Sequence, residues 1–562
     1  MSSTDALRPA GPVPTLHPVL PDDGAPGWDG ATWIGEIDQR GLDGDRARLA
    51  GADGYRRARL LIWNADRPRG SVEVGIERGE IDLAAVREAA GGLADPAPLD
   101  RHAVRPPISI VICTRDRPDQ LRTVLGSLGG LDYPEFEVLI VDNNPASGLT
   151  RPVVEAYRGR SVRVVDAVGQ GLSVARNVGL RDARHDIVAF TDDDVVIDRR
   201  WLRNLAHGFA RDERVACVCG MVPTSELVTP AQSYFDRRVG WAQRWDPAVY
   251  DLRTPSGGGL FPLEVSEFGT GANFAVRRTV VTELGGFDEA LGAGAPTGSG
   301  EDVDIFLRIM VAGHLLVREP AAVVWHSHRR TVEGLRTQMH NYGIGLSAWI
   351  TKLLVSPRTF TLVVSRLVIG LRHLGRVTEV RDDASADAAP GLRSLKRAEM
   401  SGVILGPWSL VRGRLSGRRA APLRPRPVLL RHFDVRHGRM WGESGPAGTS
   451  GRLALSGLLA GAVAALGTVQ ALPPGLRALI IAAFVLTGPG CLAVSFFAQL
   501  PRSARLALIP TAGLAVCVLA VTGLLMIGVY DPPAVLTGLA LATVVGALSR
   551  CAVLARRERT TA

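Results

Sequence analysis

The stretch from Ile108 to Thr191 alternates short apolar runs with amphipathic segments, and no other feature of the 562-residue chain restricts its fold as strongly. Continuous apolar runs of this length are typical of strands that are buried on both faces. The predicted strands are Ile108–Cys113, Phe136–Val141, Ser161–Val165 and Ile187–Thr191, and the predicted helices are Pro118–Leu128 and Leu172–Ala183. This alternation predicts an α/β sheet that is covered by helices on both faces.

Polar clusters follow three of these strands directly. The clusters are Thr114-Arg115-Asp116, Asp142-Asn143-Asn144 and Asp192-Asp193-Asp194. Ligands of such sheets bind at the carboxyl ends of the strands. We therefore expect the three clusters to form one binding site.

The acidic run Asp192-Asp193-Asp194 needs something that neutralises it, because adjacent carboxylates raise one another's pKa. A hard divalent cation does this and also bridges substrate phosphates. The simpler interpretation is a solvated turn, or an N-cap for a helix over Arg199–Phe209. An EF-hand loop is excluded, since no glycine occupies its sixth position. The position after a buried strand favours the metal site.

Two later segments add candidate catalytic groups. The run Gly300-Glu301-Asp302-Val303-Asp304 opens a predicted helix over Val303–Ala312, and acids in a first helical turn often serve only the cap and the helix dipole. The preceding loop, Gly292–Gly300, is of the glycine-rich type used as an active-site lid, which favours a general base at its hinge. The segment Val323–His328 ends a strand with both imidazoles on one face, where His326 fits a structural role or a metal-ligand role equally well.

A set of motifs then points to a family. Between residues 108 and 330 the chain contains, in this order, ISIVICTRDRP, EVLIVDNN, GQGLSVARNVGL, IVAFTDDDVV, GTGANFAVRR, LGGFDEALG, GEDVDIFLRI and VVWHSH. Together they resemble the family 2 glycosyltransferases of the GT-A fold, over about 40% of the chain. The resemblance implies an enzyme that moves a hexosyl or deoxyhexosyl group from a UDP-, GDP- or dTDP-linked sugar to an acceptor hydroxyl, with inversion.

The resemblance also implies residue roles. The metal, Mg²⁺ or Mn²⁺, is assigned to Asp192, Asp194 and His326. Contacts with the nucleotide-sugar are assigned to Thr114, Arg115, Asp142, Arg176, Asn177 and Asp193. Asp302 matches the catalytic base, and Glu301 lies beside it on the acceptor side. Asp142-Asn143-Asn144 departs from the commoner D-D-x-S, which leaves the nucleotide base and the sugar open.

Two alternatives remain beside this interpretation. One is a polyprenyl-phosphate sugar transferase, which shares the fold and often has C-terminal membrane helices. The other is a non-catalytic membrane scaffold that keeps the fold only to bind partners; the presence of Asp192, Asp194, Asp302 and His326 argues against it. A processive polysaccharide synthase is disfavoured, because no Q-x-x-R-W follows the acid of the G-E-D motif.

The flanking segments suggest a membrane-anchored protein with its catalytic domain, residues 106–350, in the cytoplasm. Residues 1–27 are predicted to be a disordered leader without a signal peptide, and residues 28–95 a small α+β unit that is rich in strands. Residues 351–450 are expected to hold interfacial helices, among them Phe360–Leu371, and a basic segment.

The C-terminal region is expected to form a bundle of about four transmembrane helices within residues 453–555. The apolar stretches are 455–472, 478–499, 507–530 and 534–553. Before them, Arg412–Arg439 contains nine arginines and one aspartate, which beside an apolar block favours anionic lipid over nucleic acid as the partner. The positive-inside rule then places both termini in the cytoplasm, at the plasma membrane, where a lipid-linked or cell-envelope glycan would be the acceptor.

Overall fold

The computed structural model describes residues 13–21, 24–96, 105–159, 161–254, 260–264, 267–356, 392–419, 474–497, 502–526 and 531–561, with a few positions within 359–366 and 453–464. The chain forms two compact units. One consists of Met1–Thr351 with Val368–His432, and the other of Lys352–Leu367 with Phe433–Ala562. The first unit contains the predicted sheet.

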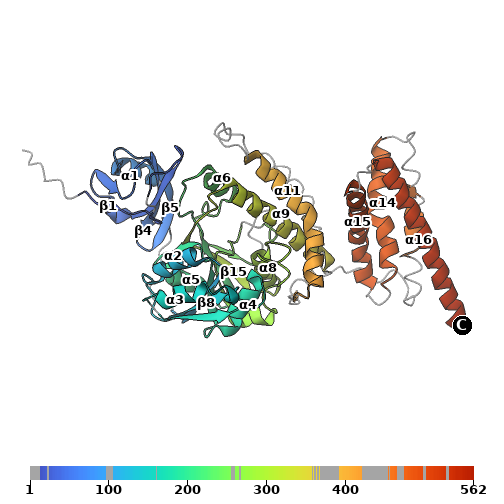
Figure 1. Ribbon diagram of the computed structural model, residues 1–562. Helices are drawn as coiled ribbons and strands as arrows, with labels where there is room; N and C mark the ends of the chain where they lie inside the picture. The colour runs from blue at the N-terminus through green and yellow to red at the C-terminus, as the bar shows by residue number, and fades with distance from the viewer. Residues whose placement is uncertain are drawn as a thin grey trace, which may run out of the picture. The chain divides into compact units, whose positions relative to one another are not determined.

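The sheet of the first unit has nine strands. They are β7 (Ile108–Thr114), β8 (Phe136–Asp142), β9 (Val162–Asp166), β10 (Ile187–Thr191), β11 (Val195–Ile197), β12 (Val215–Met221), β13 (Ala248–Tyr250), β14 (Asn273–Arg277) and β15 (Leu315–His326). Their order is β11-β15-β12-β14-β10-β7-β8-β9, with β13 paired to β15. Figure 1 labels β8 and β15 of this sheet. Strands β10, β7, β8 and β9 run parallel, which confirms the predicted α/β sheet, and β14 pairs antiparallel with β10.

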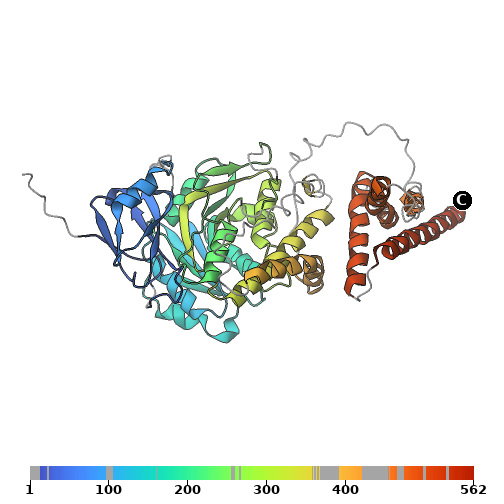
Figure 2. The same cartoon turned by 90° about the horizontal axis from the view of Figure 1, so that it is seen from above.

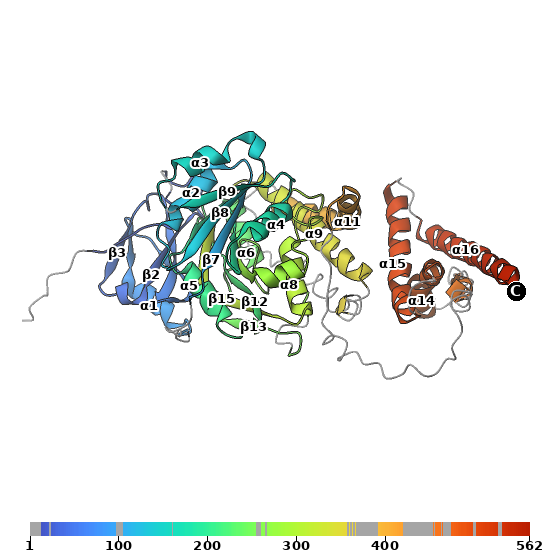
Figure 3. The same ribbon diagram turned by 90° about the horizontal axis from the view of Figure 1, so that it is seen from below.

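Helices cover both faces of this sheet (Figure 3). One face carries α2 (Pro118–Leu128), α3 (Thr150–Ala156) and α5 (Trp201–Phe209), and the other carries α4 (Leu172–Asp182), α7 (Arg278–Glu283) and α8 (Glu301–Val311). Strand β7 shows why its apolar run is continuous: Ile110 and Ile112 enter one core, whereas Val111 enters the other. A further cluster joins α6 (Pro230–Val239), α9 (Val332–Val355) and α11 (Leu392–Leu415).

Residues 13–96 form a small unit, which we call the N-terminal unit. Its elements are β1 (Thr15–Leu16), β2 (Thr32–Asp38), β3 (Arg46–Leu49), β4 (Arg57–Asn64), β5 (Arg67–Gly75), β6 (Glu80–Asp82) and α1 (Leu83–Gly91), arranged as the sheets β1-β3-β6 and β2-β4-β5.

The structure corrects two expectations for the N-terminal unit. Because β1 pairs with β3, Thr15 and Leu16 are not part of a disordered leader, contrary to the prediction for residues 1–27. The sequence Pro68-Arg69-Gly70, whose composition predicts a turn between two strands, lies inside β5; the chain reverses instead at Ala65 and Asp66, where Ala65 has a φ of 53°. A two-residue reversal with positive φ matches the twist of the flanking strands better than a turn formed further along.

The N-terminal unit packs directly on the sheet domain, as the blue and green parts of Figure 2 show. The apolar contact joins residues of β2 and β4 to residues of β12, β15 and the loop before α6, namely Ile34, Leu61, Trp63, Met221, Leu227, Val323 and Trp325. The guanidinium of Arg200 lies 4.2 Å from the centre of the Trp63 ring. The two parts therefore share a core.

A buried carboxylate lies at the same contact. The side chain of Glu319 on β15 is 0% exposed and pairs with Arg67 of the N-terminal unit at 2.8 Å and with Arg211 at 2.7 Å. Burial raises the pKa of Glu319, but the neighbouring His207 and the charges of Arg67 and Arg211 outweigh burial and lower it. The contribution of this carboxylate to stability is thus present above the ordinary pKa of a glutamate and is lost as the pH falls through the lowered one.

Glu319→Ala is expected to lower the free energy of unfolding by about 3–5 kcal/mol, because it leaves buried guanidinium groups without a counter-charge. Urea unfolding of the full chain measures the loss. A matched control is Glu73→Ala, since Glu73 on β5 is 45% exposed where it pairs with Arg59, and such pairs are worth about 0–1 kcal/mol. Equal effects of the two substitutions would contradict the prediction.

The second unit contains α14 (Pro474–Val494), α15 (Arg502–Met526) and α16 (Pro532–Thr561). A membrane span needs about 20 mostly apolar residues. No helix in the described part of the chain is long and apolar enough to cross a membrane. The predicted bundle of about four transmembrane helices is therefore not supported. Most of the predicted stretches 360–371 and 455–472 lies outside the described residues.

Candidate active site

The strand register brings the predicted clusters together. Thr114 at the end of β7 is level with Asp142 at the end of β8, and Thr191 at the end of β10 is level with Ile112. The acidic run Asp192–Asp194 follows β10 directly, at the same edge of the sheet. This confirms the expectation of one shared edge, which follows from the parallel order of β10, β7 and β8.

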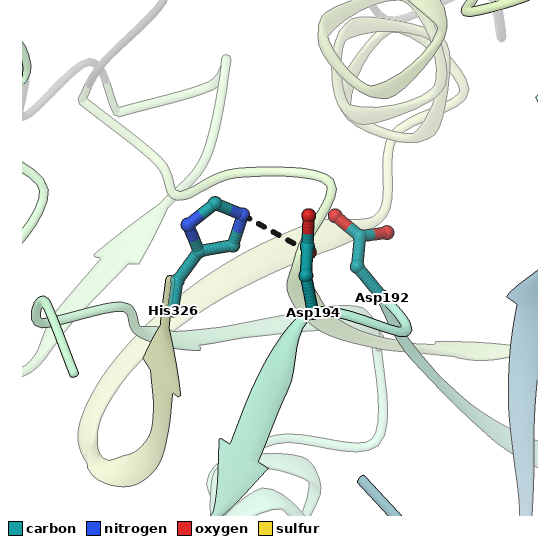
Figure 4. Close-up of side chains that lie close together, drawn as sticks. All are labelled: Asp192, Asp194 and His326. Atoms are coloured by element: carbon teal, nitrogen blue, oxygen red, sulfur yellow. Dashed lines mark ion pairs between the residues drawn. The ribbon is translucent and has the colours of Figure 1, made fainter. Parts of the chain in front are cut away.

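Strand β15 supplies a histidine to this edge. It pairs antiparallel with β11 and places His326 opposite Val195, next to the acidic run. The Nε2 atom of His326 lies 3.3 Å from Oδ1 of Asp194, and the N–H of Ser327 donates to the Asp194 carbonyl at 3.0 Å. Figure 4 shows the imidazole of His326 and the carboxylates of Asp192 and Asp194 side by side.

These three side chains form a group that could hold a metal ion. One atom each from Asp192, Asp194 and His326 lie within 4.8 Å of one another. Two carboxylate oxygens and an imidazole nitrogen suit Mg²⁺ or Mn²⁺, with remaining positions open to water or phosphate oxygens. The residues present therefore fit the predicted metal.

The electrostatics of this group follow from its burial. Burial raises the pKa of Asp192 to about 6, with Arg176 opposing the shift and Asp194 adding to it. For Asp194 burial also raises the pKa, but His326 and Arg117 outweigh it, so that the pKa falls well below its usual range. The pKa of His326 is raised: burial lowers it, and Asp194 raises it by more. A cation would replace the imidazolium charge, because a metal-bound histidine is neutral.

Asp193, the middle residue of the run, points to other partners. Its Oδ2 accepts a hydrogen bond from the Thr114 hydroxyl at 2.7 Å, and its Oδ1 accepts one from Arg117 at 2.9 Å. Arg117 also donates to Asp194 at 3.2 Å. Thr114 and Asp193, both predicted to contact the nucleotide-sugar, thus join β7 to the acidic run. Arg117 was missed, although it lies in the motif ISIVICTRDRP.

Arg176 on α4 connects the acidic run with the G-E-D motif. This side chain is only 2% exposed. Its guanidinium donates to Glu301 at 3.0 Å and to the Gly271 carbonyl at 2.8 Å, and it lies 3.5 Å from Asp192. Burial raises the pKa of Glu301 to about 7, with Asp302 adding to the shift and Arg176 opposing it. Glu301 is thus buried and in contact with Arg176, where its carboxylate can hold the guanidinium in position.

Asp302 lies at the start of α8 with its carboxylate held by the backbone. The N–H of Gly271 donates to Oδ2 at 2.8 Å, and the N–H of Val303 donates to Oδ1 at 2.8 Å. The side chain is half-buried, so one side of it stays accessible. The two N–H groups therefore fix the orientation of the carboxylate, as a general base needs.

In the cluster at the end of β8, Asp142 and Asn143 have different partners. Asp142 accepts from the Asn144 N–H at 2.9 Å through Oδ1, while its buried Oδ2 has no hydrogen-bond partner among the described residues. Asn143 accepts from the Gly171 N–H at 2.9 Å and donates to the Gly169 carbonyl at 2.7 Å. Asn143, at which the sequence departs from D-D-x-S, thus holds the loop before α4. The unpartnered oxygen of Asp142 fits the predicted contact with a nucleotide base.

Asn177 and Arg115 were also predicted to contact the nucleotide-sugar, and their partners in the structure lie outside the acidic run. Asn177 on α4 donates to the Phe287 carbonyl and to Glu289, both at 3.0 Å, and accepts from the Phe287 N–H at 2.7 Å. It therefore holds the LGGFDEALG segment. Arg115 is exposed and lies 3.6 Å from Asp116.

The glycine-rich loop Gly292–Gly300, predicted as a lid, is bonded to its surroundings. Its Ala293 carbonyl accepts from the Leu172 N–H at 2.8 Å, and its Gly294 carbonyl accepts from Arg418 at 3.1 Å. Arg418 and Arg414, which contacts Asp288, belong to the basic segment predicted to meet lipid. At least this part of that segment serves the catalytic domain instead.

Comparisons with known proteins support the predicted family. Residues 109–285 match the model of glycosyl transferase family 2. A pre-mycofactocin glycosyltransferase of Mycobacterium tuberculosis is 30% identical over 240 residues, 42% of this chain and 46% of that protein. A succinoglycan biosynthesis protein of Rhizobium meliloti is 30% identical over 229 residues, 39% of this chain and 65% of that protein.

Among solved structures, a mannosyltransferase of Pyrobaculum calidifontis in complex with GDP-Man and Mn²⁺ is 16% identical. The match covers 56% of this chain and 91% of that one, with a TM-score of 0.37. The likeness between the two overall structures is thus weak.

The family match, the α/β sheet and the acidic run together define a glycosyltransferase domain. Residues 109–285 are a glycosyl transferase family 2 region, which confirms the predicted family for this part of the chain. The chain spans 46% of the length of the first of these relatives.

Proposed function

We propose that this protein transfers a sugar from a nucleotide-sugar to an acceptor hydroxyl, with inversion and with a divalent cation at Asp192, Asp194 and His326. The observation that carries the proposal is the joining of this metal-ligand group to Asp302 through Arg176. That arginine contacts Asp192, Glu301 and the carbonyl of Gly271, whose N–H donates to Asp302. One buried side chain would thus hold both the group that binds the donor and the group that activates the acceptor hydroxyl.

In the proposed reaction, the acceptor oxygen attacks the anomeric carbon as the bond to the nucleoside diphosphate breaks. The Asp302 carboxylate takes the proton of that hydroxyl, and the inverted glycosidic bond forms in the same step. When bound, the cation supplies Lewis-acid stabilisation of the leaving diphosphate. Arg176 and Glu301 keep Asp192 and Gly271 in place, and Asp142 offers a free carboxylate oxygen to the nucleotide base.

The acceptor belongs to the same proposal. The relative from Rhizobium meliloti is a succinoglycan biosynthesis protein, which supports a glycan as the acceptor. A cell-envelope or lipid-linked glycan, and a plasma-membrane location with the catalytic domain in the cytoplasm, stay predictions from the sequence.

Incubation of the full chain with UDP-, GDP- and dTDP-sugars tests the proposal. We expect release of the nucleoside diphosphate from at least one donor, loss of release in EDTA and recovery with excess Mn²⁺ or Mg²⁺. The anomeric configuration of the product, read by NMR, reports inversion. Absence of metal-dependent turnover with every donor would favour the non-catalytic scaffold.

A further inference from the structure

A cavity of about 220 Å³ lies beside the candidate active site, and four arginines line it. We call it the arginine pocket. The lining side chains that matter are Arg237 and Arg238 at the end of α6, Trp241 and Arg244 after it, Thr270 before β14, and Arg318 on β15.

The arginine pocket has more positive than negative charge. Its lining contains no acidic residue. Glu399 pairs with Arg238 at 2.9 Å, and Glu267 is shared between Arg244 and Arg318. Arg237 is exposed and makes no ion pair within the described part of the chain. Four guanidinium groups thus meet two carboxylates.

Neighbouring acids do not remove this excess. Asp236, next to Arg237, pairs with Arg59 of the N-terminal unit at 2.7 Å. Asp246 accepts hydrogen bonds from Arg318 through its backbone carbonyl, at 3.2 and 3.3 Å. Arg318 is 8% exposed, so its charge lies at the base of the pocket.

The arginine pocket reaches both halves of the candidate active site. The Trp241 ring meets the imidazole of His326 edge to face, with 5.8 Å between the ring centres. On the other side, Thr270 precedes Gly271, whose N–H holds Asp302. The lining thus contacts the proposed metal-ligand histidine through Trp241 and adjoins, through Thr270, the residue that holds the proposed base.

We propose that the arginine pocket binds an anionic group, a phosphate or a carboxylate, on the sugar acceptor and so brings an acceptor hydroxyl to Asp302. Guanidinium groups match both anions with paired hydrogen bonds, whereas a neutral glycan would leave the excess charge uncompensated. This inference rests on the proposed function, because it names the acceptor class of that same site.

The test compares three sugars that differ in charge: glucose 1-phosphate, methyl glucuronide and methyl glucoside. Their binding to the full chain is measured by calorimetry in EDTA, which removes any metal-dependent competition from the donor site. We expect at least one charged sugar to bind about 10-fold or more tightly than methyl glucoside, since bonds to charged groups are worth that much. The two charged sugars distinguish a phosphate-bearing acceptor from a uronate-bearing one.

Arg237→Gln should remove the preference for the charged sugar, and Arg336→Gln should keep it. Arg336 on α9 is a matched control, because it is also exposed and has no ion pair with the described residues. Thermal unfolding shows that both variants fold. Equal binding of all three sugars, or a preference that survives Arg237→Gln, would overturn the inference. Metal-dependent donor hydrolysis by the unaltered chain tests the proposed function separately, because water replaces the acceptor there.

Discussion

Asp302→Asn is expected to slow sugar transfer by about 10²–10⁴-fold while the affinity for the nucleotide-sugar stays within a factor of about two. The substitution keeps the size of the side chain and one acceptor oxygen, but an amide cannot take the proton of the acceptor hydroxyl. Binding should survive because the predicted donor contacts lie on other residues. Steady-state kinetics with the best donor, together with calorimetry of donor binding, measures both quantities.

The matched control for this prediction is Asp53→Asn. Asp53 is an exposed acid of the N-terminal unit and has no side-chain partner among the described residues. Its substitution changes the net charge by the same amount and should leave the rate unchanged. Transfer at a near-normal rate by Asp302→Asn would remove Asp302 from the role of general base.

Asp194→Ala is expected to abolish the dependence of donor binding on Mn²⁺ or Mg²⁺. Loss of a residue that only supports a metal ligand costs about 10–100-fold in metal affinity, so loss of a ligand should cost at least as much. The alanine also leaves His326 without its closest acid, which lies at 3.3 Å. Calorimetry of donor binding with and without the cation measures the effect.

The readout for Asp194→Ala separates a metal role from a structural one. In the unaltered chain the cation should tighten donor binding, and in the variant it should change nothing. Asp53→Ala serves as the control and should keep the full response to the cation. Donor binding by Asp194→Ala that still tightens with Mn²⁺ would show that Asp194 is not a ligand, provided that thermal unfolding confirms a folded chain.

The buried Arg176 explains why the two predictions concern one site. Its guanidinium lies 5.4 Å from the Phe274 ring and 5.6 Å from the Phe287 ring, so it is held by aromatic packing as well as by hydrogen bonds. From there it reaches Asp192 on one side and Glu301 on the other. The same side chain therefore links the acidic run to the start of α8.

The sequence by itself determined the α/β sheet and the edge at which the site lies. Continuous apolar runs define buried strands, and parallel strands must end at a common edge, so the polar residues after Thr114, Asp142 and Thr191 had to converge. The motifs around them determined the family. These properties depend on local pattern and on the direction of the strands, which are both readable along the chain.

Only the tertiary structure decided which side chain of each cluster meets which partner. Asp193 turns to Thr114 and Arg117, and Glu301 turns to Arg176, because contacts between β7, α4 and α8 come from segments far apart in the sequence. The predicted transmembrane bundle shows where composition alone is insufficient. It was inferred from apolar stretches, and no helix in the described part of the chain is long and apolar enough to span a membrane.

The arginine pocket and the packing of the N-terminal unit on the sheet were likewise invisible to pattern. Arg237 and Arg318 are 81 positions apart, and nothing in the sequence marks them as neighbours. Pairing and burial depend on distance in space, whereas motifs record only distance along the chain. For that reason the sequence located the acidic run, and the fold decided which partners each of its three carboxylates meets.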